Sequence, residues 1–349
     1  MTRRIAFAIG SRANYGSCKA VLTEAKARGL DVVVIAYATA ILARYGDVAA
    51  ALARDFEVIR CATHLEGGEP EQAVQSSGLA ASALGHALQQ ARPDLLYVVG
   101  DRYEVLPAAY AAHLLGIPVA HQMGGELSGT VDESVRHAIT KLSHWHFVAT
   151  QNAGERLARM GEDPGAVFVT GCPRIDLCRG ITAEPGRFLM VMFHPVTSEH
   201  DTGRQMGAVL DGVAHAWDGP VHLWWPNADP GTEAIVQRIR EAKATYLTHR
   251  QLPPERFLSL LAGTACIVGN SSAAIREGSY LGTPAVNVGS RQDHRERAEN
   301  VRSVAPEASI IAQAIRQQTA YGRYPRSTLY GSGTAAKSIV DTLAGRDLP

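Results

Sequence analysis

The chain has 349 residues, more than one hydrophobic core usually serves, so two domains are expected. Hydrophobic residues make up 46% of it and charged residues 19%, which is typical of a soluble globular protein and excludes a disordered one. Lys plus Arg and Asp plus Glu number 34 each, so no net field favours nucleic acid or an anionic membrane. We therefore expect neither as a partner, and any phosphate must be bound locally.

The N-terminus and the cysteines indicate a cytoplasmic protein. The first apolar run spans only about six residues, too few for the core of a signal peptide. No apolar run approaches the roughly 20 residues that a membrane helix needs. The five cysteines are odd in number, and their spacing fits neither a disulfide framework nor a zinc site. We predict reduced thiols, and neither a metal ion nor an organic cofactor.

Short apolar runs alternate with helical stretches throughout the first half. The candidate strands are Ile5–Ile9, Val32–Ala36, Glu57–Arg60, Leu95–Val99, Pro118–His121, His146–Ala149 and Val167–Thr170. Helical stretches lie between them, among them Gly16–Arg28, Gln72–Ala91 and Tyr103–Leu115. Alternation of this kind is typical of a parallel sheet with helices on both faces.

A second series of candidate strands follows, at Phe188–Phe193, Val221–Trp225, Ala265–Val268 and Ala285–Val288. Between the two series, Cys178–Gly186 contains glycine and proline and lacks periodicity, which indicates an interdomain linker. We predict an α/β protein with two doubly wound Rossmann-like domains, residues 1–179 and 180–349. The carboxyl ends of their strands would face a common cleft, where ligands bind.

A phosphate site is predicted where Gly269-Asn270-Ser271-Ser272 follows a strand and opens a helix. The N-terminus of a helix offers N–H donors and the positive end of the dipole to an anion. Glu277, within the first two turns, is placed to accept hydrogen bonds from ribose hydroxyls. Asn and Ser are also ordinary helix caps, so a capped helix that binds nothing is the alternative.

Three carboxylates follow strands of the first half. Asp101 comes after the fourth candidate strand, Glu126 comes after the fifth behind two glycines, and Asp132 opens the next helix. Carboxylates crowded in a partly dry cleft raise one another's pKa, which suits proton abstraction and donation. Capping of a helix is the alternative for Asp101 and Asp132, and a solvated side chain for Glu126. That helix is predicted to bury a stripe made of Val135, Ala138, Ile139 and Leu142.

Other polar residues stand near strand ends or in turns. Arg12 lies in the apparent glycine-bounded turn Gly10–Gly16 and could grip a diphosphate, or be an exposed loop residue. His194 and Arg291 are plausible phosphate partners, although a lone His at a strand end is more often structural. Asn227 follows another strand of the second half.

Together these motifs resemble the UDP-N-acetylglucosamine (UDP-GlcNAc) 2-epimerase family, nearest its hydrolysing branch. The resemblance covers nearly the whole chain in order. The matching segments are Gly100–Arg102, Gly124–Glu126, Asp132–Ser143, His194–Thr197, Pro226–Asn227, Gly269–Glu277, Gly289–Val301 and Leu329–Gly333.

The resemblance implies a GT-B fold whose last helix crosses back to the first domain, and a soluble enzyme that we expect to be a homo-oligomer. It implies Asp101, Glu126 and Asp132 around the sugar, with His194 as a fourth catalytic group at the diphosphate. It implies that UDP is held by Arg12, Asn227, Ser271, Ser272, Glu277 and Arg291.

The implied reaction eliminates UDP to give 2-acetamidoglucal and then adds water, which releases N-acetylmannosamine (ManNAc) and UDP. If UDP adds instead, the product is UDP-ManNAc, as in the non-hydrolysing branch. A GT-B glycosyltransferase and a sugar-nucleotide sensor without turnover are further alternatives. Two positions depart from the hydrolysing pattern: Asn14 stands where Asp or Glu is usual, and Ala40 stands where His is usual.

Overall fold

The computed structural model describes residues 3–65, 70–128, 130–196, 199, 201–226, 231–242, 246–250 and 252–349. Contacts divide the chain into two compact units. Unit 1 comprises Met1–Glu126, Asp132–Asp176 and Gly331–Pro349, and unit 2 comprises Leu127–Val131 and Leu177–Tyr330. The domain limits at residues 179 and 180 stay a prediction, because a compact unit is not by itself a domain that folds alone.

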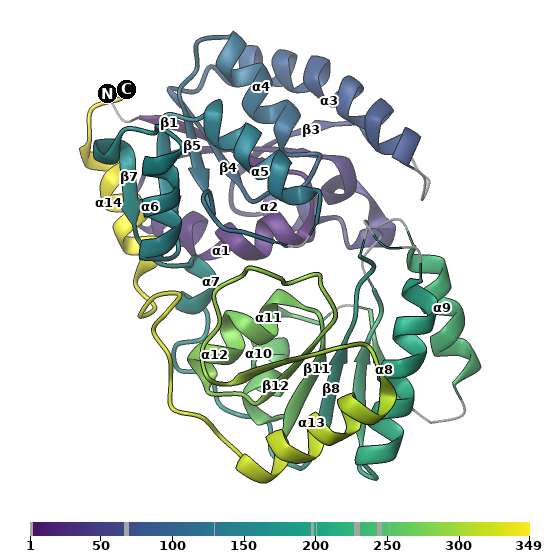
Figure 1. The fold of residues 1–349 in the computed structure, drawn as a ribbon. Coiled ribbons are helices and arrows are strands. Elements are labelled where there is room, and N and C mark those ends of the chain that lie inside the picture. Colours follow the sequence, from purple (N-terminus) through teal and green to yellow (C-terminus); the bar gives the residue numbers. More distant parts are fainter. Residues whose placement is uncertain are drawn as a thin grey trace. The chain divides into compact units, whose positions relative to one another are not determined.

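A parallel sheet forms the centre of unit 1 (Figure 1). Its described strands are β1 (Arg4–Ile9), β2 (Asp31–Tyr37), β3 (Glu57–Cys61), β4 (Leu95–Val99), β5 (Val119–Gln122), β6 (Trp145–Val148) and β7 (Val167–Val169). Their order is β3-β2-β1-β4-β5-β6-β7, and all pairs are parallel. The order reverses between β1 and β4, which defines a doubly wound sheet.

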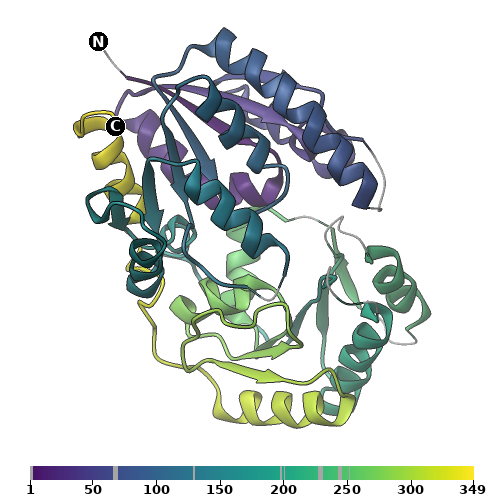
Figure 2. The ribbon, with the colours of Figure 1, turned by 45° about the horizontal axis from the view of Figure 1, so that its top comes forward.

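Helices cover both faces of this sheet because alternate side chains of each strand point to opposite sides. The helical segments are α1 (Arg12–Ala27), η1 (Ala38–Ile41), η2 (Ala43–Tyr45), α2 (Val48–Leu52), α3 (Pro70–Ala91), α4 (Leu106–Leu114), α5 (Asp132–Lys141), α6 (Gln151–Arg159), η3 (Pro164–Ala166), α7 (Pro173–Asp176) and α14 (Ala335–Gly345). Ile5 and Phe7 share a core with α1, α2 and α14. Ala6 and Ala8 share a second core with α3 and α4. Figure 2 shows the ribbon of both units from a second side.

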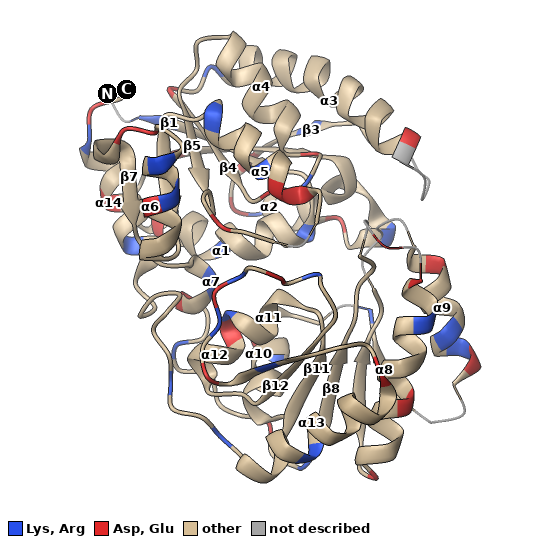
Figure 3. Cartoon of the chain, in the orientation of Figure 1, with Lys and Arg blue, Asp and Glu red and all other residues tan. Residues whose placement is uncertain are grey.

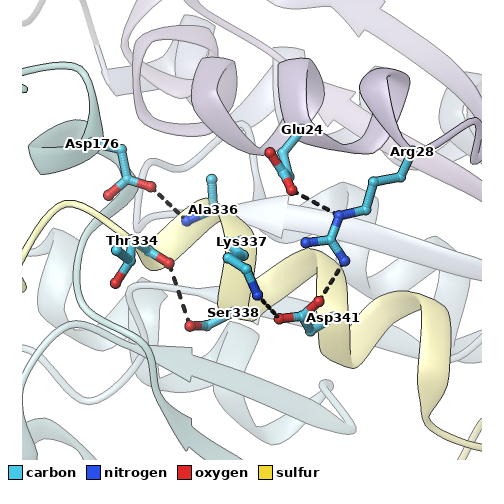
Figure 4. A network of polar contacts seen from close by, with 8 residues as sticks. All are labelled: Glu24, Arg28, Asp176, Thr334, Ala336, Lys337, Ser338 and Asp341. Carbon is cyan, nitrogen blue, oxygen red and sulfur yellow. Dashed lines mark hydrogen bonds and ion pairs between the residues drawn. The ribbon is translucent and has the colours of Figure 1, made fainter.

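The last helix, α14, is fixed within unit 1 by polar contacts (Figure 4). The Asp176 carboxylate accepts hydrogen bonds from the backbone N–H groups of Ala335 at 3.1 Å and Ala336 at 2.7 Å. Asp341, further along the helix, forms an ion pair with Arg28 of α1. Asp176 therefore satisfies N–H donors that the first turn of a helix leaves without partners in the helix.

Unit 2 repeats the same sheet topology. Its described strands are β8 (Leu189–Met192), β9 (Val221–Trp224), β10 (Leu247–His249), β11 (Cys266–Gly269), β12 (Ala285–Val288) and β13 (Val301–Val304). All pairs are parallel, in the order β10-β9-β8-β11-β12-β13. The order reverses between β8 and β11. The predicted fold class, two doubly wound α/β units, is confirmed, while the common cleft stays a prediction.

The helices of unit 2 are α8 (Thr202–Ala216), α9 (Thr232–Glu241), α10 (Pro254–Gly263), α11 (Ser272–Ile275), α12 (Glu277–Leu281) and α13 (Ala308–Tyr321). Side chains of α8, α9 and α13 share one core with β8. One prediction is wrong here: the helix after Ser271 is not continuous. Arg276, with φ −87° and ψ −76°, stands between α11, which ends at Ile275, and α12, which begins at Glu277.

The segment predicted as a linker, Cys178–Gly186, is in part bound to α10. The backbone N–H of Glu184 donates to the Ser259 carbonyl at 2.9 Å, and the Glu184 carboxylate pairs with Arg256. All five cysteines are buried thiols, as predicted. None of the helices in the described part of the chain combines the length and apolarity that spanning a bilayer requires.

Candidate active site

Four of the predicted site residues follow the strands between which each sheet reverses its order. In doubly wound sheets, ligands bind beyond the carboxyl ends of the strands at this point. In unit 1, Arg12 follows β1 and Asp101 follows β4. In unit 2, His194 follows β8 and Ser271 follows β11. The topology therefore gives each unit one candidate ligand-binding edge.

After β1, the predicted glycine-bounded turn is wrong, because α1 begins at Arg12. The Ser11 hydroxyl caps the helix by accepting a hydrogen bond from the Asn14 N–H at 3.3 Å. The buried side-chain amide of Asn14 then donates to the Val99 carbonyl at the end of β4, at 3.1 Å. An Asp or Glu at this position would have no N–H to donate to the Val99 carbonyl. This need for a donor is a structural reason for Asn at position 14. Arg12 is half-buried, and this burial lowers its pKa from the ordinary value.

Asp101 and Glu126 are brought together by a third residue, Arg136 of α5. The Arg136 guanidinium is completely buried. One of its nitrogens donates to the Asp101 carboxylate, and another donates to the backbone carbonyl of Glu126 at 2.5 Å. The Asp101 side chain is 21% exposed. The two predicted catalytic residues therefore both accept hydrogen bonds from one guanidinium group, Asp101 through its carboxylate and Glu126 through its backbone carbonyl.

Further contacts fix the backbone just before each carboxylate. Arg156 of α6 donates to the carbonyl of Gly125. Gly125 has φ 73°, and a Cβ there would lie 2.3 Å from the Ala153 carbonyl oxygen, so only glycine fits. Nε2 of the buried His121 lies 2.8 Å from the Gly100 carbonyl oxygen. Burial lowers the pKa of His121 to about 3, so the ring is neutral and donates this hydrogen bond.

Asp132 is the first residue of α5 and is partly exposed. The predicted buried stripe is wrong in part, because Ala138 is exposed while α5 buries Arg136, Ile139 and Thr140. Residues four apart share one face of a helix. Asp132 therefore stands on the same face as Arg136, one turn closer to the start of the helix.

In unit 2, the side chain of Asn270 joins the two strand ends at the reversal point. It accepts from the His194 backbone N–H and donates to the His194 carbonyl, both at 2.8 Å. Gly269 just before it has φ 136°, and a Cβ would lie 2.0 Å from the Met192 carbonyl oxygen. The close approach of β11 to β8 therefore requires glycine at this position.

The predicted UDP residues Ser271 and Arg291 also meet at Asn270. The Ser271 hydroxyl caps α11 by accepting from the Ala273 N–H at 3.3 Å. An Arg291 nitrogen lies 3.4 Å from the Asn270 carbonyl oxygen. Ser272 is the first residue of α11 and is partly exposed. A helix start and a guanidinium thus lie at one strand end, a combination that suits an anion.

Glu277 begins α12 and is 1% exposed, far more enclosed than the sequence suggested. Asn227 lies outside the described residues. His194 is buried at the end of β8 beside Asn270.

Comparison with known families identifies the family to which this chain belongs. The family model described as UDP-N-acetylglucosamine 2-epimerase matches residues 23–344. The chain belongs to the UDP-N-acetylglucosamine 2-epimerase family. It is 32% identical to the UDP-N,N'-diacetylbacillosamine 2-epimerase (hydrolyzing) of Legionella pneumophila, over 98% of this chain and 96% of that one. It is 30% identical to the UDP-N-acetylglucosamine 2-epimerase of Neisseria meningitidis serogroup B, over 96% of this chain and 93% of the relative.

Solved structures of the 2-epimerase family share the fold. The UDP-GlcNAc 2-epimerase of Methanocaldococcus jannaschii, crystallised with UDP-GlcNAc and UDP, matches with a TM-score of 0.79 at 17% identity. The match covers 97% of this chain and 99% of that structure. This likeness shows that both doubly wound units are arranged along the chain as in other 2-epimerases.

Sequence reasoning missed two residues that organise the site of this 2-epimerase family member. The pattern of apolar positions in α5 does not reveal that this helix also buries Arg136. Its spacing of four residues from Asp132 was the available signal. Asn270 was noticed only as part of a capping motif, and no sequence signal shows that its side chain reaches His194.

Proposed function

We propose that this protein is a hydrolysing UDP-GlcNAc 2-epimerase. It converts UDP-GlcNAc and water into ManNAc and UDP. Membership of the family supports the 2-epimerase activity. The similarity to the hydrolysing 2-epimerase of Legionella supports the hydrolysing outcome, and the similarity to the UDP-N-acetylglucosamine 2-epimerase of Neisseria supports GlcNAc as the sugar.

The reaction begins with cleavage of the C1–O bond, because the C2 hydrogen is not adjacent to a carbonyl group. UDP leaves with the bonding electron pair, and the sugar gains oxocarbenium character that acidifies C2–H. Asp101 or Glu126 takes the C2 proton, and the C–H electrons form the C1=C2 double bond of 2-acetamidoglucal. Water then adds at C1 while an acid protonates C2 from the opposite face, which gives the manno configuration.

The residues of unit 2 would hold the leaving group. Diphosphate charge that develops as the C1–O bond breaks is stabilised by preorganised donors. Arg291, His194 and the N–H groups beyond Ser271 supply such donors around Asn270. Glu277 and Ser272 would bind the nucleoside part of UDP, and Arg12 is a further candidate ligand of the diphosphate.

The observation that carries this proposal is that one guanidinium, that of Arg136, binds both the Asp101 carboxylate and the backbone carbonyl of Glu126. Epimerisation at C2 needs one group to remove a proton and another to return it to the opposite face. Two carboxylate residues at one sheet edge meet that need. A glycosyltransferase, the other class with this fold, transfers its sugar without proton exchange at C2 and needs no such pair.

The test is to incubate the protein with UDP-GlcNAc and follow the products by proton NMR. Equal amounts of ManNAc and UDP support the proposal. UDP-ManNAc without free UDP would show the non-hydrolysing reaction instead, and GlcNAc plus UDP would show hydrolysis without epimerisation. A parallel incubation with UDP-N,N'-diacetylbacillosamine decides which sugar is preferred, with kcat/KM as the criterion.

A further inference from the structure

Tyr330 contacts two segments of unit 2 that carry proposed UDP ligands. It is 2% exposed, although it lies in a turn rather than in a helix or strand. Its ring faces the guanidinium of Arg276, whose central carbon Cζ is 5.8 Å from the ring centroid. Its hydroxyl donates a hydrogen bond to the backbone carbonyl of Glu296 at 2.7 Å. One buried side chain therefore joins the α11–α12 junction to the loop between β12 and β13.

Arg276 forms the junction between α11 and α12, and its side chain is buried. Ser272 begins the helix before it, and Glu277 begins the helix after it. The Arg276 carbonyl accepts a hydrogen bond from the Ser279 hydroxyl at 2.8 Å, which fixes its backbone to α12. A guanidinium is attracted to the face of an aromatic ring, most strongly where water is excluded. The ring of Tyr330 therefore stabilises the arrangement of the two helices that carry Ser272 and Glu277.

The loop between β12 and β13 is highly charged. The nine residues that begin with Arg291 include three Arg and three acidic residues, and Figure 3 shows the two charge colours following one another along this loop. Arg297 donates to the Gln292 carbonyl, and the Gln292 side chain donates to the Asn270 carbonyl, both at 2.9 Å. Tyr330 binds the residue just before Arg297 in the sequence. Its hydroxyl therefore supports the loop conformation that places Arg291 at Asn270.

The backbone that follows Tyr330 is held as closely as its side chain. Gly331 has φ 112°, and a Cβ there would lie 3.0 Å from the Cα of Gly171. A side chain at this position would be strained, so the close approach of the two backbones requires glycine. Tyr330 is thus fixed at both its ring and its backbone before any ligand binds.

We propose that Tyr330 is a positioning residue for UDP. It aligns the helices that carry Ser272 and Glu277 with the loop that carries Arg291, and because it is buried it acts through these segments. The inference rests on the proposed function, which assigns the three residues to UDP. Binding is tighter when the contacting groups are already held in their bound arrangement, since less conformational freedom is lost.

Calorimetric titration with UDP, together with steady-state kinetics on UDP-GlcNAc, tests this role. Tyr330→Leu removes both contacts and should raise the Kd for UDP about 10- to 30-fold. The KM should rise by a similar factor while kcat falls at most about threefold, because Arg291 keeps its own contact with Asn270. Tyr330→Phe keeps the ring beside Arg276 and should raise the Kd only about two- to fivefold. A merely structural role would lower the fraction of protein that binds UDP and leave the Kd of that fraction unchanged.

Tyr324→Leu is the matched control. Tyr324 also lies between α13 and α14, stacks on Tyr321 with 4.2 Å between the ring centroids, and donates its hydroxyl to Gln318 at 2.6 Å. This variant loses a ring contact and a hydroxyl contact away from the proposed ligands, so the Kd for UDP should change less than about twofold.

The outcomes separate this inference from the proposed function. A wild type that binds UDP, with Tyr330→Leu binding it equally well or Tyr324→Leu losing as much affinity, would overturn the inference alone. A wild type that does not bind UDP would overturn the proposed function and this inference with it.

Discussion

Replacement of Arg136 by methionine is the sharpest test of how the Asp101 carboxylate and the backbone of Glu126 are held. Methionine preserves much of the aliphatic stem of arginine but removes the hydrogen bonds to Asp101 and to the Glu126 carbonyl. Breaking a fully buried ion pair costs about 3–5 kcal/mol. Because the Asp101 side chain is 21% exposed, water takes up part of this loss, and we expect about 3 kcal/mol.

The variant should remain folded, since native domains are stable by about 5–15 kcal/mol. Its activity should fall much further than its stability implies. The guanidinium fixes the positions of both carboxylate residues, and a shift of about 1 Å in a catalytic group costs on the order of 100-fold in rate. We therefore expect kcat to fall about 100-fold in a protein that still unfolds cooperatively in urea.

Arg156→Met is the matched control. Arg156 is partly buried and donates to the Gly125 carbonyl, so this variant also loses a contact to the same loop. A lost hydrogen bond of this kind costs about 1 kcal/mol, and Asp101 keeps its contact with Arg136. The assay is steady-state release of UDP, with urea denaturation in parallel. If Arg136→Met retains kcat within threefold of the wild type while folded, the guanidinium does not organise the catalytic pair and the reasoning is refuted.

Three further predictions concern chemistry, packing and pH. Asp101→Asn and Glu126→Gln should each lower kcat at least about 100-fold while UDP affinity, measured by calorimetry, changes less than twofold; a large loss of UDP affinity would contradict their assignment to the sugar. Gly269→Ala places a Cβ about 2 Å from a carbonyl oxygen of β8 and should lower the free energy of unfolding by more than about 2 kcal/mol. Gly345→Ala is the control, because its added Cβ meets no atom, and it should cause no such loss. Burial lowers the pKa of His121 from 6.5 in the unfolded chain to about 3. Between these two pH values the unfolded state binds more protons than the folded state, so the free energy of unfolding falls as the pH drops from 6.5 towards 3. From pH 6.5 to pH 5 this group should cost about 2 kcal/mol, and urea titrations of His121→Gln should lack that contribution; equal pH slopes for the two proteins would contradict it.

The sequence predicts the buried strands well because parallel strands covered on both faces are continuous apolar runs. Leu95–Val99 and Ala285–Val288 coincide with β4 and β12. The strands β10 and β13 were not predicted; both are short, and their residues are exposed or only partly buried. Without a buried face, such a strand leaves no hydrophobic pattern to find.

The sequence identified candidate site residues by their positions just after predicted strands. Asp101, His194 and Ser271 were proposed because each follows a buried run closely, and their roles stay predictions. The residues that hold them were not found, since the contact of Arg136 with Asp101 joins residues that are 35 positions apart. Local spacing cannot reveal such a contact, and it depends on the order of the strands in the finished sheet.

The central claim is that UDP departs before a carboxylate of unit 1 removes the C2 proton. Conversion of UDP-GlcNAc in deuterated water, followed by mass spectrometry and NMR of the isolated sugar, tests it most directly. We predict one deuterium at C2 of every ManNAc molecule, introduced at the rate of turnover and lost together with activity in Asp101→Asn. ManNAc that retains protium at C2 would contradict the claim.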